Sequence, residues 1–240
     1  MDCIYTNDMI DEIGESLIRK FDYSAYSAGQ AVDIERFITD YLEYRILYDK
    51  IAEEDAGKTA FLSDGKTSLC VWRSGKREWI IPPAKTIVVD SHFANANMKA
   101  PLRFRLAHEA GHVLMNKLNG GQLTSAFSNE FDGERDYSIA ELGKLFSIGE
   151  LQATSMGVAL LMPRSVVINA VCRSKGKKRI PVFGNSVLLK EDRQLLYDMA
   201  EHFEVSYKSL FYRLRDLKLF DYRLIDEYIA MNLGEIGGGT

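Results

Sequence analysis

The sequence has few cysteines, no long apolar run and no excess of positive charge. Its three cysteines, Cys3, Cys70 and Cys172, are far apart and include no Cys-x-x-Cys pair, which argues against a disulfide framework and against a cysteine zinc site. No apolar run is long enough to cross a bilayer. The formal net charge of -4 gives no general reason to expect nucleic-acid or anionic-membrane binding, although it is compatible with a local basic patch.

The N-terminal segment also lacks the basic and then apolar layout of a secretory signal, because acidic and apolar residues alternate through residues 1–21. We therefore expect a cytoplasmic protein with free thiols. A chain of 240 residues that is 46% hydrophobic can bury a substantial core, as one large domain or as a domain with a small appendage.

Two of the four histidines stand in a His-Glu-x-x-His motif over residues 108–112. The flanking residues predict a mostly buried helix over about residues 101–118, on which His108 and His112 share a face and can bind one metal ion. Glu109 lies beside them and can take a proton from water at the metal, the general-base arrangement of zinc peptidases. Chance spacing of two histidines is the alternative, but buried histidines beside a buried glutamate are costly unless hydrogen-bonded or bound to metal.

A catalytic zinc site usually has three protein ligands, so a third is expected downstream. The extended metzincin motif is excluded, because Met115 and Leu118 stand where its glycine and histidine would be. Glu150 is the best candidate, at the start of a second predicted helix that Pro163 ends. Ser147 and Glu150 also fit a capping box, and the spacing alone does not decide between the two roles. The competing ligands are Glu130, Asp132, Glu134, Asp136, Glu141 and His202.

The chain before the motif predicts helices over residues 10–21 and 33–51, followed by four β-prone runs at residues 59–62, 67–72, 78–81 and 86–90. Turn signals at Asp64-Gly65 and Ser74-Gly75 favour a small antiparallel meander, whose exposed edge could receive a peptide. Residues 120–136 have the composition of a loop, either a flap beside the cleft or a plain connector. We leave His92 and Tyr137 out of the site.

The C-terminal part combines a basic run at residues 173–179, a β-prone run at 180–183 and helices from about residue 188. Residues 199–215 are typical of a helix-turn-helix in which Ser206 caps the second helix. A DNA-recognition helix would present Lys208, Arg213, Arg215 and Lys218. The apolar residues of the same segment favour a structural helical pair instead.

His108-Glu-Ala-Gly-His112, followed by Glu150-x-x-Ala153 and by Leu160-Leu-Met-Pro163, resembles the ImmA/IrrE metallopeptidases over roughly residues 33–219. The resemblance implies that Glu150 is the third zinc ligand and that the substrate is a helix-turn-helix transcriptional repressor, cleaved to switch on stress or mobile-element genes. The chain departs from the family pattern at three positions: Thr154 for Asn, Met156 for Phe and Gly157 for Ala. These changes affect the packing and the side chains that would orient the ligands, whereas the ligand residues themselves are present.

The sequence thus predicts an α+β fold: a zincin-like core with a small antiparallel sheet packed on the metal-binding helices, plus a C-terminal helix-turn-helix-like part. We expect a metallopeptidase domain at residues 1–172, a helical subdomain at 186–233 and a flexible tail at 234–240. The expected activity is that of a zinc-dependent endopeptidase in which His108, His112 and Glu150 bind Zn(II) and Glu109 is the catalytic base. Manganese or iron would also suit two histidines and one carboxylate.

The alternative function is that of a non-catalytic DNA- or protein-binding regulator with a structural or vestigial metal site. Its partner would be DNA or a protein held by the C-terminal helices, whereas the peptidase hypothesis requires a protein substrate. Neither hypothesis involves a membrane. Direct binding to DNA is the weaker expectation, because the chain around the helical pair is not basic.

Overall fold

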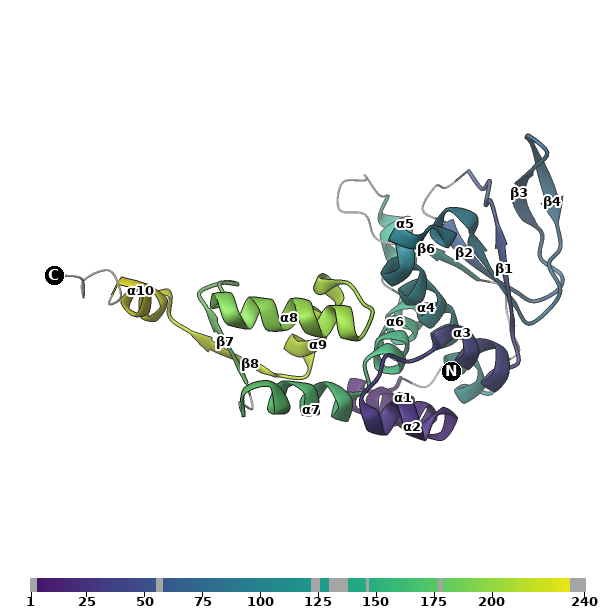
Figure 1. Cartoon of the computed structure of the whole chain (residues 1–240). Coiled ribbons are helices and arrows are strands. Elements are labelled where there is room, and N and C mark those ends of the chain that lie inside the picture. Colours follow the sequence, from purple (N-terminus) through teal and green to yellow (C-terminus); the bar gives the residue numbers. More distant parts are fainter. Residues whose placement is uncertain are drawn as a thin grey trace. The chain divides into compact units, whose positions relative to one another are not determined.

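A computed structural model of the chain describes residues 4–54, 58–121, 126–129, 138–145, 147–176 and 179–233 (Figure 1). These residues form a mixed α and β structure. Internal contacts divide the chain into two compact units, Met1–Pro163 and Arg164–Thr240, which are described separately. The predicted tail at residues 234–240 lies outside the described residues.

The first unit begins with helices and continues with strands. The helix that carries the His-Glu-x-x-His motif, called the metal-motif helix below, comes in the chain between the fifth and sixth strands. Its helical elements are α1 (Asn7–Phe21), α2 (Tyr23–Ala28), α3 (Ile34–Arg36), the π-helix η1 (Phe37–Tyr41), the 3-10 helices η2 (Ser91–Ala94) and η3 (Ala96–Met98), α4 (Lys99–Leu118), α5 (Ile139–Leu145) and α6 (Ile148–Leu161). Its strands are β1 (Arg45–Asp49), β2 (Lys58–Ser63), β3 (Leu69–Arg73), β4 (Lys76–Ile80), β5 (Thr86–Asp90) and β6 (Ala126–Asn129).

The main sheet is mixed, with the strand order β1-β5-β2-β6. β1 runs parallel to β5, whereas β2 pairs antiparallel with both β5 and β6. The predicted antiparallel meander is therefore wrong. The turn at Asp64-Gly65 exists, since Asp64 accepts hydrogen bonds from the amides of Lys66 and Thr67, but it leads out of the sheet and does not pair β2 with β3.

The strands β3 and β4 form a separate hairpin that projects beside the main sheet (Figure 1). Ser74 and Gly75 both have positive φ, at 51° and 81°, as the tight turn predicted for this dipeptide requires. The base of the hairpin is anchored by Leu69 and Val71, which pack with residues of β2 and β5 in a buried cluster. Its outer part exposes Trp72 and Trp79, at 40% and 65% of their surface.

The helix predicted over residues 33–51 is wrong in its second half. After α3 and η1 the helix ends at Leu42, and Glu43 takes a positive φ of 62°. Arg45–Asp49 then forms β1 at the edge of the sheet. The first residues of the predicted helical stripe do lie in α3 and η1, but Tyr48 at its end lies in a strand, because pairing with β5 offers this backbone a sheet partner about forty residues further along the chain.

The helices α4 and α6 make the most extensive helix contact of the first unit. Two glycines permit their close approach. A Cβ at Gly111 would collide with the carbonyl group of Ala153, and one at Gly157 would lie 2.8 Å from the carbonyl oxygen of Ala107 and 3.0 Å from the amide nitrogen of His108. The backbone of the metal-motif helix therefore rests directly on α6.

Gly111→Ala is expected to lower the free energy of unfolding by about 1–3 kcal/mol, because the new methyl group meets backbone that cannot rotate away. The loss should appear although alanine favours a helix by up to about 1 kcal/mol over glycine. Gly143→Ala on α5 is the matched control, since a Cβ there meets nothing within 4 Å. Urea unfolding followed by far-ultraviolet circular dichroism measures both; equal stability of Gly111→Ala and the native chain would contradict this packing.

The second unit consists of α7 (Arg164–Lys175), β7 (Ile180–Phe183), α8 (Lys190–His202), α9 (Tyr207–Asp216), β8 (Phe220–Arg223) and α10 (Ile225–Leu233). β7 and β8 form a parallel pair, and α8 packs on α9. Ser206 caps α9 as predicted, because its Oγ accepts the amide of Ser209 at 3.0 Å. Arg213 is only 5% exposed, so it is not available to a DNA groove.

No single helix in the described ranges is long and apolar enough to cross a membrane. Only α6 and α7 taken together, as a bent pair, have the length and apolar composition of a membrane span. In the structure, α6 packs on α4 and α1.

Candidate metal centre

The two histidines of the motif lie side by side on α4, as their spacing predicts. Their ring centroids are 4.6 Å apart, and the two Nε2 atoms face each other at 3.0 Å. Both side chains are largely buried, with about a tenth of their surface exposed. Two ring nitrogens held this close in a buried site need a proton or a cation between them.

Glu150 reaches the same point from the first turn of α6. Its Oε2 lies 3.3 Å from Nε2 of His108, and its Oε1 lies 3.3 Å from Nε2 of His112. Ser147 caps α6 at the same time, with its Oγ accepting the Glu150 amide at 3.4 Å. The serine half of the predicted capping box is therefore present, whereas the Glu150 carboxylate that would complete the box lies against the two imidazoles.

Charge within the cluster raises the pKa of His112 and lowers the pKa of Glu150. Burial lowers the pKa of His112, but its hydrogen bond with Glu150 and the charges of Glu109 and Glu150 outweigh burial and raise that pKa. Burial raises the pKa of Glu150, yet the hydrogen bonds and charges of His108 and His112 outweigh it and lower that pKa to about 2. A metal cation competes with a proton for the His112 nitrogen. Metal binding should therefore strengthen as pH rises.

The spacing of these atoms fits a shared metal ion. Ligand atoms about 2.1 Å from a tetrahedral metal lie roughly 3.4 Å from one another. The separations in the cluster are 3.0, 3.3 and 3.3 Å, and its donors are two imidazole nitrogens and one carboxylate. Among the described residues, this is the one group of three or more histidine, cysteine or acidic side chains placed to hold a metal.

Thr154 supports the cluster from α6, one turn after Glu150. Its Oγ1 lies 3.1 Å from Nδ1 of His108. If the imidazole donates its Nδ1 hydrogen to this oxygen, its Nε2 lone pair remains for a metal. Asparagine stands at this position in the ImmA/IrrE pattern, and both side chains offer an oxygen that can accept this hydrogen bond.

Thr154→Val is expected to weaken metal binding by about 10- to 100-fold, because valine keeps the shape of threonine but removes the acceptor that orients His108. Thr154→Ser, which keeps the hydroxyl, is the matched control and should remain close to the native affinity. Competition with a chromogenic chelator measures the three affinities. Equal affinities for valine and threonine at this position would show that the hydrogen bond does not orient the ring.

Glu109 is completely buried. Its charge is close enough to His112 to contribute to the raised pKa of that imidazole. The sequence alone identified Glu109, His108, His112 and Glu150 as candidates, and all four lie on α4 and α6, the two helices that pack most closely.

The other candidates from the sequence are not placed in this cluster. Glu130, Asp132, Glu134, Asp136 and Tyr137 lie outside the described residues, as does most of the predicted flap, and so does the side chain of Glu141. His202 belongs to α8 in the second unit.

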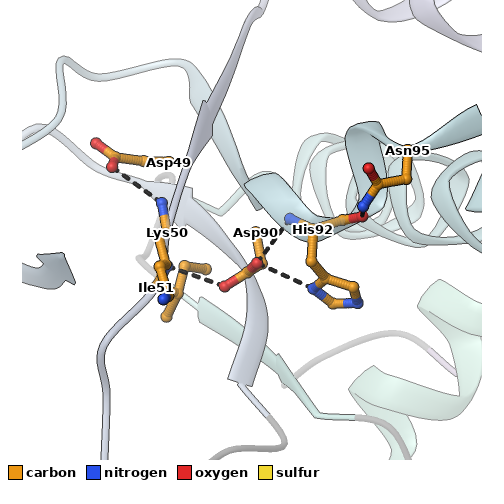
Figure 2. A network of polar contacts seen from close by, with 6 residues as sticks. All are labelled: Asp49, Lys50, Ile51, Asp90, His92 and Asn95. Carbon is orange, nitrogen blue, oxygen red and sulfur yellow. Dashed lines mark hydrogen bonds and ion pairs between the residues drawn. The ribbon is translucent and has the colours of Figure 1, made fainter.

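His92, which we left out of the predicted site, is held by Asp90 (Figure 2). One oxygen of Asp90 lies 2.9 Å from both the amide nitrogen and Nδ1 of His92, and the other accepts the amide of Ile51. The His92 side chain is half exposed. Asp90 thereby ties the ends of β1 and β5 together and caps η2. The sequence does show this aspartate two residues before the histidine, at the end of a strand. The pair has a structural role here, because Asp90 holds both His92 and the amide of Ile51.

The family described as the IrrE N-terminal-like domain, a peptidase family, matches residues 66–215. The matched span covers more than half of the chain and includes the motif on α4 and Glu150 on α6. A comparison with curated proteins found no match.

Proposed function

The chain belongs to the IrrE N-terminal-like peptidase family, and from this premise we propose that it is a zinc-dependent endopeptidase that cleaves a helix-turn-helix transcriptional repressor. The observation that carries the proposal is the convergence of His108, His112 and Glu150, from two helices, to separations of 3.0–3.3 Å. Two histidines and a carboxylate are the ligand set of catalytic zinc sites that leave one position open.

In the proposed mechanism, His108, His112 and Glu150 hold the metal and Thr154 keeps His108 in the orientation that binding requires. Zinc in such a site polarises a peptide carbonyl and makes water more acidic. The carboxylate of Glu109 accepts the proton of the attacking water and then delivers it to the nitrogen of the leaving amine.

An edge strand that follows the metal-motif helix in the chain supports an endopeptidase over a hydrolase of small molecules. β6 follows α4 in the chain and is the outer strand of the described sheet next to β2. An extended peptide can add to such an edge through main-chain hydrogen bonds, which would present one peptide bond to the metal.

The test is cleavage of purified helix-turn-helix repressors from the source organism by the full chain, with mass spectrometry to locate each cut. We expect one or a few cuts that a chelator abolishes and that added zinc restores, because the three ligands serve the reaction only with the metal bound. Cleavage of unfolded casein without cleavage of any repressor would retain the peptidase and reject the repressor as substrate. No chelator-sensitive cleavage of either protein would reject the proposed function.

A further inference from the structure

The two units carry opposite charge. Residues 164–240 contain thirteen lysines and arginines against ten aspartates and glutamates, whereas residues 1–163 contain seventeen against twenty-four. The overall charge of -4 therefore hides a C-terminal unit of net positive charge. A surface that attracts anions is expected in the second unit and not in the first.

The second unit contains a cleft of about 430 Å³ between α8 and α9. Its lining includes four aromatic rings, those of Tyr197, Tyr207, Phe211 and Tyr212, and no acidic side chain. A volume of this size falls within the range of small-molecule sites, which are typically lined by aromatic groups and a few polar ones.

Each helix contributes a cation and a tyrosine four residues apart. Arg193 precedes Tyr197 on α8, and Lys208 precedes Tyr212 on α9, so each pair shares one helical face within the cleft. Nζ of Lys208 lies 6.0 Å from the centre of the Tyr212 ring. The two helices thus present the same combination of a positive charge and a flat ring to one cavity.

The rings are held in place and yet remain open to solvent. Tyr197 contacts Tyr207 across the two helices, with ring centroids 4.7 Å apart. Even so, Tyr197 exposes 52% of its surface and Tyr212 exposes 44%. Core packing does not need rings that are so exposed, whereas a ligand with a planar group of its own can stack on them.

We propose that this cleft binds a nucleotide, with the base stacked on the tyrosines and the phosphate held by Lys208 and Arg193. A basic groove with aromatic platforms is the arrangement by which proteins bind unpaired bases. An acidic peptide would use the cations but not the rings. A DNA duplex would need the exposed length of a recognition helix, on which Arg213 is buried. The nucleotide is either free or part of a single-stranded nucleic acid.

The experiment uses the full chain and two kinds of probe. Calorimetry measures binding of ATP and AMP, and fluorescence anisotropy measures binding of labelled oligonucleotides of about ten nucleotides, single-stranded and duplex. Two variants alter the cleft: Tyr197→Leu removes an exposed ring, and Lys208→Glu reverses a charge. Lys218→Glu is the matched control, because it makes the same charge change at a residue that follows the end of α9 and does not line the cleft.

We expect saturable binding that weakens at least about fivefold in both cleft variants and stays within about twofold of native in Lys218→Glu. Binding of ATP or AMP would identify a free nucleotide as the ligand, and binding of single strands alone would identify a nucleic acid. No binding of any probe, preference for the duplex, or loss in Lys208→Glu but not in Tyr197→Leu would each overturn the proposal. Glu109→Gln should bind as the native chain does, because the cleft is independent of the peptidase chemistry.

Discussion

Glu109→Gln is expected to reduce peptide-bond cleavage by about 10²- to 10⁴-fold while the bound metal stays at the native level. Glutamine has nearly the size of glutamate, so it fits the fully buried position, but its amide cannot accept a proton from water. The proposed metal ligands are untouched by this change. The expected result therefore separates chemistry from metal binding.

Cleavage is measured at saturating enzyme, with elemental analysis of the same sample. Glu12→Gln on α1 is the matched control, since Glu12 is exposed and should tolerate the same chemical change without effect. Activity within about threefold of native in Glu109→Gln would move the general base to another residue, because loss of a general base costs at least about 100-fold. Loss of metal in this variant would instead show that Glu109 supports the metal site.

Glu150→Ala is expected to weaken metal binding by more than the roughly 10- to 100-fold that loss of a ligand's hydrogen-bonding partner costs. The change leaves two imidazoles and removes the only carboxylate of the cluster. A catalytic metal site with two protein ligands in place of three is not expected to retain its ion through purification. Elemental analysis of untagged protein prepared without chelator should therefore find about one metal ion per native chain and far less in the variant.

The control for Glu150→Ala is the stability of both proteins in the presence of chelator. If the variant is folded to the same extent by circular dichroism, its lower metal content reports ligand loss and not unfolding. Native metal content in Glu150→Ala would remove this residue from the proposed ligand set. Equal absence of metal from both proteins would reject the metal centre itself.

The local sequence predicted the two of the three cluster residues that lie within one helix. The four-residue spacing of His108 and His112 determines that they share a face, whatever the rest of the fold does. Glu150 could not be selected in this way, because a Ser-x-x-Glu pattern reads equally well as a cap. The choice depends on how closely α4 and α6 approach, and that depends on Gly111 and Gly157 meeting backbone of the opposite helix.

The sheet was predicted less well for the same reason. The turn at Ser74-Gly75 has a local signature and forms as predicted, whereas the turn at Asp64-Gly65 leads out of the sheet and does not pair the strands on either side. β1 was mistaken for helix, since its partner β5 is distant in sequence and its apolar residues also fit a helical period. Local patterns predict that a chain turns or extends, but they do not predict its partner.

The β3–β4 hairpin gives this protein an unusual optical signature. Its two tryptophans, Trp72 and Trp79, are the only ones in the sequence, and both lie exposed on that hairpin. Tryptophan emission is therefore expected to be red-shifted already in the native state and to change little when α4 and α6 unfold. It will shift to the blue when a molecule covers the hairpin, so the native fluorescence reports docking at this surface far better than it reports folding.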